Sequence, residues 1–560
     1  MTPQPKNRMR PIHLLPLFPL LLVPQAGASP VSPGFQESVV QEMEWGEREV
    51  EHLLNRAGLG AGTEQVQRWA ARSQAELIDH LMEPRVVADP FPYQIVERQR
   101  GALNDLSEDE RRAEQQRIRR ESRRQAGDFV MWWVDRMITD VDPLGERMTL
   151  FWHGHFTSSL QTVRHGHLMI QQNELLREHA LGNYGTLLRE VLKDPAMIRY
   201  LDNNSNRKGR PNENLAREVM ELFSLGEGNY TEDDIKEAAR ALSGHTAGQD
   251  GKHRFVPRQH DFGEKTILGV TGKHDLDDLV NILLEQDACP RWIVQRLLTY
   301  FEGAAPTLDR VETYARIFEE NGMELRPTLR ALFEDPAFYR PAIVGAKVLS
   351  PIDYLVGLNR RLESTAAPLV VSQGAATLGQ KLFDPPNVKG WEGGFAWIST
   401  STLMQRGNLA GMMLGVIDMS DLRSDEELDE MMESMDEASM DDEMQMDDAA
   451  TPPQRARNEM AVIARAMSRF EYRPRLNLRA RLTQADADTD VKVVDLMLHE
   501  LLAIEVPAES AGPLVTWFQA EREAMEIPEK AVLRGRRRGV EDLLRRLAHK
   551  ILSLPEAQLG

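Results

Sequence analysis

Residues 188–196 read LREVLKDPA and residues 329–337 read LRALFEDPA, so the chain contains the same local pattern twice. In both stretches the proline ends one helix and can begin the next, because proline lacks the amide proton that a helix interior needs but fits the first helical turn. Two copies are too few to indicate a solenoid. The pattern predicts consecutive helices without a repeat fold.

Helix N-termini are marked at two further places. Ser107 with Glu110, and Thr231 with Asp234, have the spacing of reciprocal capping pairs, with aspartate replacing the usual glutamate or glutamine in the second. The chain of 560 residues can also bury a large core. The sequence therefore predicts a mainly α fold, a multi-helix globular array.

Strand signals are sparse and gather between residues 253 and 270. There, residues 254–256 and 266–268 flank a turn at Gly263 and could pair with each other. We therefore expect β structure to be limited to one or two short β-hairpins.

The N-terminus has the composition of an export signal. Three basic residues within the first ten precede an apolar run over 14–23, and residues 26–28 offer a small-x-small cleavage site. The alternative, a membrane anchor, is disfavoured because prolines interrupt the run and it is shorter than the roughly 20 residues that span a bilayer. We expect residues 1–28 to be a signal peptide, and the mature protein to be periplasmic or secreted and not membrane-embedded after cleavage.

The net charge of −20 is concentrated in one segment. Residues 421–448 contain fourteen acidic side chains and a single arginine. Together with the prolines that follow, this composition predicts a disordered, acidic, Met-rich insertion over 421–453. We expect it to separate a main helical domain, 40–420, from a C-terminal helical segment, 454–560, that packs on that domain.

Two compositional features exclude other classes of protein. Residues 111–124 carry seven arginines but no interleaved aromatic residue, which favours a solvated helix and no nucleic-acid partner. Cys289 is the only cysteine, so an internal disulfide is impossible and a cysteine-rich metal site is excluded. The chain also lacks the usual phosphate-loop, serine-hydrolase and zinc-protease motifs.

The run FWHGHF at residues 151–156 places His153 and His155 on either side of a glycine, beside aromatic rings that can exclude water. In an unbroken helix, side chains two residues apart point about 200° apart, so both rings reach one ion only if the helix breaks at Gly154 or the run is extended. A hydrogen-bonded core histidine at 155 is the alternative.

The run RQHDFGEK at residues 258–265 concentrates ionisable side chains in a predicted loop. His260 and Asp261 could there act as base, acid or metal ligand. Alternatively, Asp261 accepts hydrogen bonds from backbone amides in a turn ahead of Gly263.

Residues 202–213 read DNNSNRKGRPNE and place oxygen ligands at the first, third, fifth and twelfth positions, as a calcium loop does. The candidate ligands are Asp202, Asn204, Asn206 and Glu213. An arginine at the sixth position replaces the glycine of such loops, so an asparagine-rich capping turn is the alternative.

Two neighbouring features complete the candidate site. The predicted helix after residue 213 places Glu218 and Glu221 on one side and apolar residues on the other, which normally indicates a solvated face opposite a core face. The carboxylate pair becomes a candidate only if another segment covers it, as in a catalytic cleft. The loop at residues 383–397 contains two adjacent prolines and several aromatic rings that could stack on a sugar or peptide, or be buried between helices.

These motifs resemble the bacterial domain of unknown function 1800 family, which has no assigned activity. The residues that carry the resemblance are 53–58, 151–156, 200–221, 260–265, 383–397 and 552–560. Phe223 is a departure, because the family often has histidine there. The resemblance implies an exported protein, with an exported protein of the domain of unknown function 1501 family as a partner.

Two hypotheses follow. The first is a cell-envelope enzyme, assisted by a divalent metal ion, whose site gathers five side chains: His153, His155, Glu218, His260 and Asp261. The second is a noncatalytic envelope protein that binds a glycan, peptide or protein through residues 386–397. Convergence of the five side chains would favour the first.

Overall fold

The structure is a computed structural model. It describes residues 44–83, 90–93, 107–248, 250–364, 368–416, 478–504, 506–529 and 539–560. The predicted signal peptide, 1–28, and the predicted acidic insertion, 421–453, lie outside these residues. The chain divides into two units, Met1–Glu44 and Trp45–Gly560, and everything below concerns the second.

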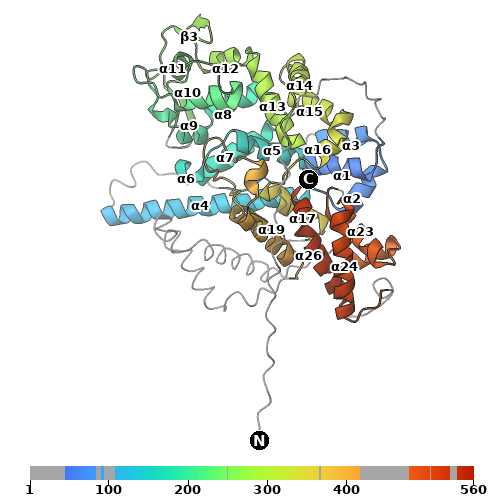
Figure 1. Cartoon of the computed structure of the whole chain (residues 1–560). Helices are drawn as coiled ribbons and strands as arrows, with labels where there is room; N and C mark the ends of the chain where they lie inside the picture. The colour runs from blue at the N-terminus through green and yellow to red at the C-terminus, as the bar shows by residue number, and fades with distance from the viewer. Residues whose placement is uncertain are drawn as a thin grey trace. The chain divides into compact units, whose positions relative to one another are not determined.

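The first half of this unit is helical, as expected (Figure 1). Its helices are α1 Glu47–Ala57, α2 Thr63–Ala70, α3 Gln74–Met82, α4 Glu108–Thr139, α5 Pro143–His155, α6 Leu160–Val163, α7 Gly166–Glu178, α8 Tyr184–Lys193, α9 Pro195–Tyr200, η1 Asn203–Ser205, α10 Asn214–Glu218, η2 Val219–Leu225 and α11 Glu232–Ala241. The predicted capping pairs Ser107 with Glu110 and Thr231 with Asp234 are confirmed at the starts of α4 and α11.

The second half continues in the same way. Its helices are α12 Leu276–Leu284, α13 Ala288–Glu302, α14 Leu308–Glu320, α15 Leu325–Glu334, η3 Pro336–Tyr339, α16 Pro341–Val344, α17 Pro351–Arg361, α18 Pro368–Thr377, η4 Gly394–Trp397, α19 Thr400–Met413, α22 Leu478–Gln484, α23 Asp490–Leu501, α24 Ala508–Ala524, α26 Val540–Leu552 and η5 Pro555–Gln558. The mainly α prediction is confirmed.

The duplicated Asp-Pro pattern forms the predicted helix junctions. Asp194 caps α9 by accepting a hydrogen bond from the Met197 amide, with a proline in the first turn. Asp335 caps η3 in the same way through the Ala337 amide. Proline therefore ends one helix and starts another at both places.

The strands form two short antiparallel hairpins. β1 His245–Ala247 pairs with β2 His253–Phe255, and β3 Lys265–Ile267 pairs with β4 Val270–Gly272. The expected pairing of residues 254–256 with 266–268 is wrong. Leu268 and Gly269 both have positive φ, +48° and +82°, as a tight two-residue hairpin turn requires, so β3 turns directly into β4.

The core joins helices from distant parts of the sequence. Side chains from α4, α7, α17, α18 and α19 share one apolar cluster with side chains from α22, α23 and α26. The C-terminal residues add polar anchors: the Gly560 amide donates to the Lys347 carbonyl at 2.9 Å, and Arg406 Nη1 donates to Gln558 Oε1 at 3.2 Å. No helix among the described residues is long and apolar enough to cross a membrane.

Candidate functional site

Helix α5 runs unbroken through Gly154, so His153 and His155 meet different neighbours. His153 Nε2 accepts a hydrogen bond from the Phe383 amide at 3.2 Å, and its ring packs edge-on against Trp133. Burial lowers the pKa of His153 to about 4. The neutral ring therefore ties the loop at residues 383–397 to the core.

His155 is equally buried. Its Nε2 lies 3.1 Å from the Phe223 carbonyl, to which it donates in the neutral state. Burial, with a contribution from the charge of Arg296, lowers the pKa of His155 to about 3. The interpretation of His155 as a hydrogen-bonded core histidine fits this geometry. The two conditions under which both imidazoles could share an ion, a helix break at Gly154 or an extended run, are not met, because residues 143–155 form one α-helix.

The backbone of the next motif departs from α geometry. Helix α10 ends at Glu218 and continues as a π-helix, η2, in which the Ser224 hydroxyl donates to the Val219 carbonyl. Phe223, in this π-helix, is fully buried and packs against Phe156. Such π segments are rare and often lie at functional sites, because they change the direction in which side chains leave a helix. In this chain the change from α-helix to π-helix comes directly after Glu218.

Four side chains gather where this helix meets the loop at residues 383–397, and we call them the Glu218 site: Glu218, Glu221, Tyr230 and Lys389. The Tyr230 hydroxyl donates to Glu221 Oε2 at 2.9 Å, and Lys389 Nζ lies 3.9 Å from Glu221 Oε1. Glu218 accepts no hydrogen bond from another described residue. Burial and the charge of Glu221 raise the pKa of Glu218, although Lys389 and Arg217 oppose the shift.

Tyr200, at the end of α9, connects this site to the start of the loop. Burial and the negative charges of Glu218 and Asp384 raise its pKa. Asp384 accepts hydrogen bonds from the Ser159 hydroxyl at 2.8 Å and from Gln161 Nε2 at 2.9 Å. The charges of Asp384 and Glu218 thus both act on the Tyr200 hydroxyl.

The loop itself is held close to α5. The Thr157 hydroxyl donates to the Val388 carbonyl, and Gly390 approaches so closely that a Cβ there would lie 2.4 Å from the Gly154 carbonyl oxygen. Its aromatic residues differ in burial, and stacking on a sugar or peptide stays a prediction. Trp397 is buried between helices, whereas Phe395 is 83% exposed.

The His260 loop forms a separate cluster. His260 Nδ1 lies 2.8 Å from the Ser243 carbonyl, and Asp261 forms an ion pair with Arg240 at 2.9 Å. Asp261 also accepts a hydrogen bond from the Gly263 amide at 2.9 Å, as in the turn given as the alternative. The Arg240 guanidinium lowers the pKa of Asp261 to about 2. No hydrogen bond, ion pair or ring contact between described residues joins this cluster to the Glu218 site.

Residues 202–213 form an asparagine-rich turn. Asp202 Oδ2 accepts from the Ser205 hydroxyl, Asn204 Oδ1 accepts from the Ala247 amide, and Asn206 Oδ1 accepts from the Asn212 amide. Glu213 lies 3.4 Å from Arg217. Each predicted calcium ligand thus has a protein partner, and calcium binding here stays a prediction.

The five predicted catalytic residues do not form one ligand set. Within the described ranges, no group of three or more His, Cys, Asp or Glu side chains has an arrangement that could hold a metal ion. The structure brings Glu218 together instead with Tyr230 and Lys389. No local sequence signal connects Tyr230 with Glu221, and Lys389 comes from a segment far along the chain.

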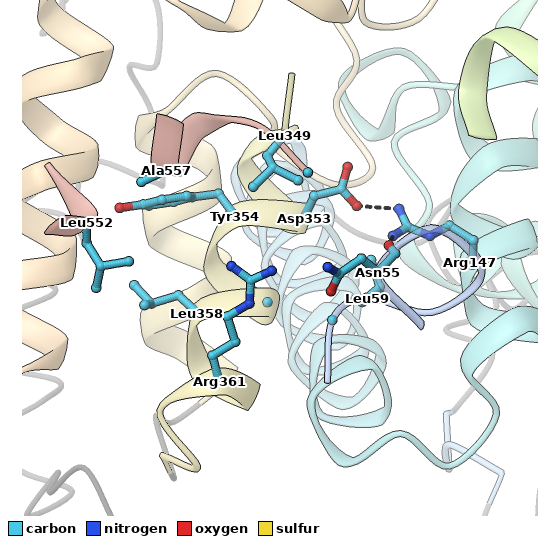
Figure 2. A pocket seen from close by; sticks show the side chains of 13 residues that line it. Asn55, Leu59, Arg147, Leu349, Asp353, Tyr354, Leu358, Arg361, Leu552 and Ala557 are labelled. Atoms are coloured by element: carbon cyan, nitrogen blue, oxygen red, sulfur yellow. Dashed lines mark hydrogen bonds and ion pairs between the residues drawn. The ribbon is translucent and has the colours of Figure 1, made fainter. Parts of the chain in front are cut away.

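A small internal cavity lies elsewhere in the fold, between α1, α5 and α17 (Figure 2). Arg147, Asp353 and Arg361 line it, and Arg147 forms an ion pair with Asp353. The cavity volume of about 30 Å³ accommodates one or two water molecules, not an organic substrate. It is therefore not the candidate active site.

The fold and the site define a mainly helical protein with a half-buried carboxylate beside a second acid and a lysine. The chain belongs to the family described as "Protein of unknown function (DUF1800)", whose sequence profile matches residues 52–559. The family resemblance is thereby confirmed. Searches of the curated proteins and of the solved structures gave no significant match.

Proposed function

We propose that this chain is an exported cell-envelope enzyme that performs acid–base chemistry at the Glu218 site. The observation that carries the proposal is the contrast between two neighbouring carboxylates. Glu221 has a phenol donor and a cation beside it, whereas Glu218 is half-buried, has no hydrogen-bond donor among the described residues and has a raised pKa. A raised pKa favours the protonated form of Glu218 and suits it to acid–base chemistry.

In this proposal Glu218 is the proton donor or acceptor, and Glu221 with Lys389 orients a polar substrate. The π-helix supports the assignment because it fixes the backbone directly after Glu218. The proposal includes a divalent metal ion bound by Glu218 and Glu221. Two carboxylates are the protein ligands with which a hydrated Mg²⁺ is often bound, the remaining ligands being water and substrate.

Two measurements test the acid–base role. Glutamate-selective ¹³C labelling and a pH titration should show one carboxyl group with a raised pKa that disappears in Glu218→Gln. A panel of chromogenic esters, phosphates and glycosides should reveal an activity that falls by about 10²-fold or more in Glu218→Gln, the usual contribution of a general acid. Glu285→Gln, an exposed position at the end of α12, is the control and should retain activity.

The proposal fails if Glu218 titrates at the ordinary position, or if any activity found is equal in Glu218→Gln and wild type. The noncatalytic binding protein would then be the better hypothesis. Elemental analysis of the purified protein, with and without Glu218→Gln and Glu221→Gln, decides whether a divalent ion is bound.

Location and partner are separate parts of the proposal, supported by the composition of residues 1–28 and by the family resemblance. N-terminal sequencing of the protein from a periplasmic fraction should find a start near Ser29. Co-purification should recover an exported protein of the domain of unknown function 1501 family. A full-length N-terminus would contradict the predicted cleavage.

A further inference from the structure

A long groove with basic side chains runs along α4. It has about 970 Å³ of free volume and is lined by α4, α6, α18 and the segment before the loop at residues 383–397. Five of its lining side chains are basic: Arg119, Arg123, Arg124, Arg164 and Lys381. Its acidic lining residues are Asp128 and Asp384.

Local ion pairs neutralise only part of this charge. Arg124 pairs with Glu121 at 2.7 Å, and Lys381 pairs with Asp384 at 3.3 Å. Arg119 and Arg164 have no carboxylate partner among the described residues; the Arg164 Nε donates only to the Gln161 carbonyl, at 3.4 Å. The groove therefore presents two cations that no described side chain neutralises.

Apolar side chains lie between these charges. Ala126, Val130, Leu369 and Leu382 line the groove together with Gly127. The buried positions of α4 begin at Ser122, so the arginines stand at the boundary between the exposed and packed parts of the helix. We call the basic side chains the rim of the groove and the apolar side chains its floor. An extended chain would complement both if it carried acidic side chains for the rim and flexible apolar side chains for the floor.

We propose that the occupant is the chain's own segment at residues 421–448. The segment has fourteen acidic residues and six methionines, which matches both the rim and the floor. Methionine adapts to irregular apolar surfaces because its side chain is unbranched and flexible. The opposite charges attract, and the covalent connection gives the segment an effective concentration in the millimolar range.

The attachment point supports this assignment. Leu409 of α19 packs on Gly374 of α18, and α18 also lines the groove. From Leu409 to Val416 the chain rises about 10 Å in helical geometry, and the five residues to position 421 add at most about 18 Å. The acidic segment therefore starts within about 30 Å of α18 and is long enough to follow the groove.

Crosslinking in the full chain tests the proposal. Gln373→Cys places a thiol on the exposed lining of the groove, and Ser434→Cys places one in the acidic segment. A short bismaleimide should join them at least tenfold faster than it joins Ser434→Cys to Glu320→Cys on α14, outside the groove. The ratio should approach one in 0.5 M NaCl, because salt screens exposed charges.

Charge reversal provides the matched control. Arg119→Glu with Arg164→Glu should remove the preference for Gln373→Cys, while Arg111→Glu with Arg112→Glu, the same change nearer the start of α4, should leave it intact. Circular dichroism confirms that each variant is folded. Equal crosslinking rates at the two positions, an unchanged ratio after reversal in the groove, or crosslinks only between two copies would overturn the proposal.

Discussion

Lys347 Nζ lies 3.2 Å from the Asp353 carboxylate, and both side chains are buried. Arg147 pairs with the same carboxylate, so one anion serves two cations. Burial, together with the charge of Arg147, lowers the pKa of Lys347 to about 7, whereas Arg147 and Lys347 hold the pKa of Asp353 well below its usual range against the effect of burial. Asp353 is thus the residue on which the cluster depends.

We predict that Asp353→Asn destabilises the protein by about 3–5 kcal/mol, because it leaves the buried Arg147 guanidinium without its counter-charge. Lys347→Met should cost about 1 kcal/mol or less, because it removes a charge that burial disfavours and keeps the apolar stem. Urea unfolding of both variants measures the difference. An equal loss of unfolding free energy in the two variants would contradict the prediction, because it would show that Lys347 contributes as much to stability as Asp353.

The buried histidines predict a pH dependence of stability. The folded-state pKa values of His153 and His155 are lowered to about 4 and about 3. Below about pH 6.5 the unfolded chain binds protons at these positions while the folded chain does not, so the free energy of unfolding decreases as pH falls. Each histidine contributes up to about 1.4 kcal/mol per pH unit within this window.

Unfolding experiments at pH 5.0, 5.5, 6.0 and 6.5 should therefore show a falling midpoint in wild type. His155→Gln should reduce the slope, because one of the buried histidines with a lowered pKa is gone. His274→Gln, which removes a histidine with an exposed hydrogen bond to the Val270 carbonyl, is the control and should leave the slope unchanged. Identical slopes in all three proteins would contradict the assignment.

Local signals in the sequence predicted the helices well. Ser107 with Glu110 and Asp194 with Pro195 determine helix starts through contacts within a few residues, so their effect can be read without the fold. The hairpin register could not be read in this way. Leucine strongly disfavours positive φ, so residue preferences did not indicate a turn at Leu268.

The site was only partly predictable for a related reason. Glu218 stood out because a polar helix face lay near other suggestive motifs. The role of His155 depended on the Phe223 carbonyl, a backbone atom 68 residues away, and the partners of Glu221 come from Tyr230 and Lys389. Such contacts result from tertiary packing, which residue spacing does not encode.

The turn at Leu268 gives a stability prediction. Its φ of +48° is unfavourable for leucine but accessible to asparagine, and the Leu268 amide donates to Asp234 Oδ1 at 2.7 Å, which anchors the turn to α11. Leu268→Asn should therefore raise the free energy of unfolding by about 0.5–1 kcal/mol, whereas Leu268→Val should lower it. Thermal unfolding measures both changes, and a destabilised Leu268→Asn would show that leucine packing outweighs the backbone strain.

The last prediction separates residues that support the fold from residues that support function. His155 is buried, packs against Phe156 and donates to the Phe223 carbonyl, which also accepts from the Tyr184 hydroxyl. His155→Ala therefore creates a cavity and removes one of the two hydrogen bonds to that carbonyl, and should cost about 2–4 kcal/mol of stability. Glu218 is half-buried with a raised pKa and no described hydrogen-bond donor, so Glu218→Gln should leave stability within about 0.5 kcal/mol or increase it. Urea unfolding of the two variants, run beside the activity panel, should therefore give a stable, inactive Glu218→Gln and a destabilised His155→Ala. A His155→Ala protein of wild-type stability that lacks activity would instead return His155 to the catalytic site.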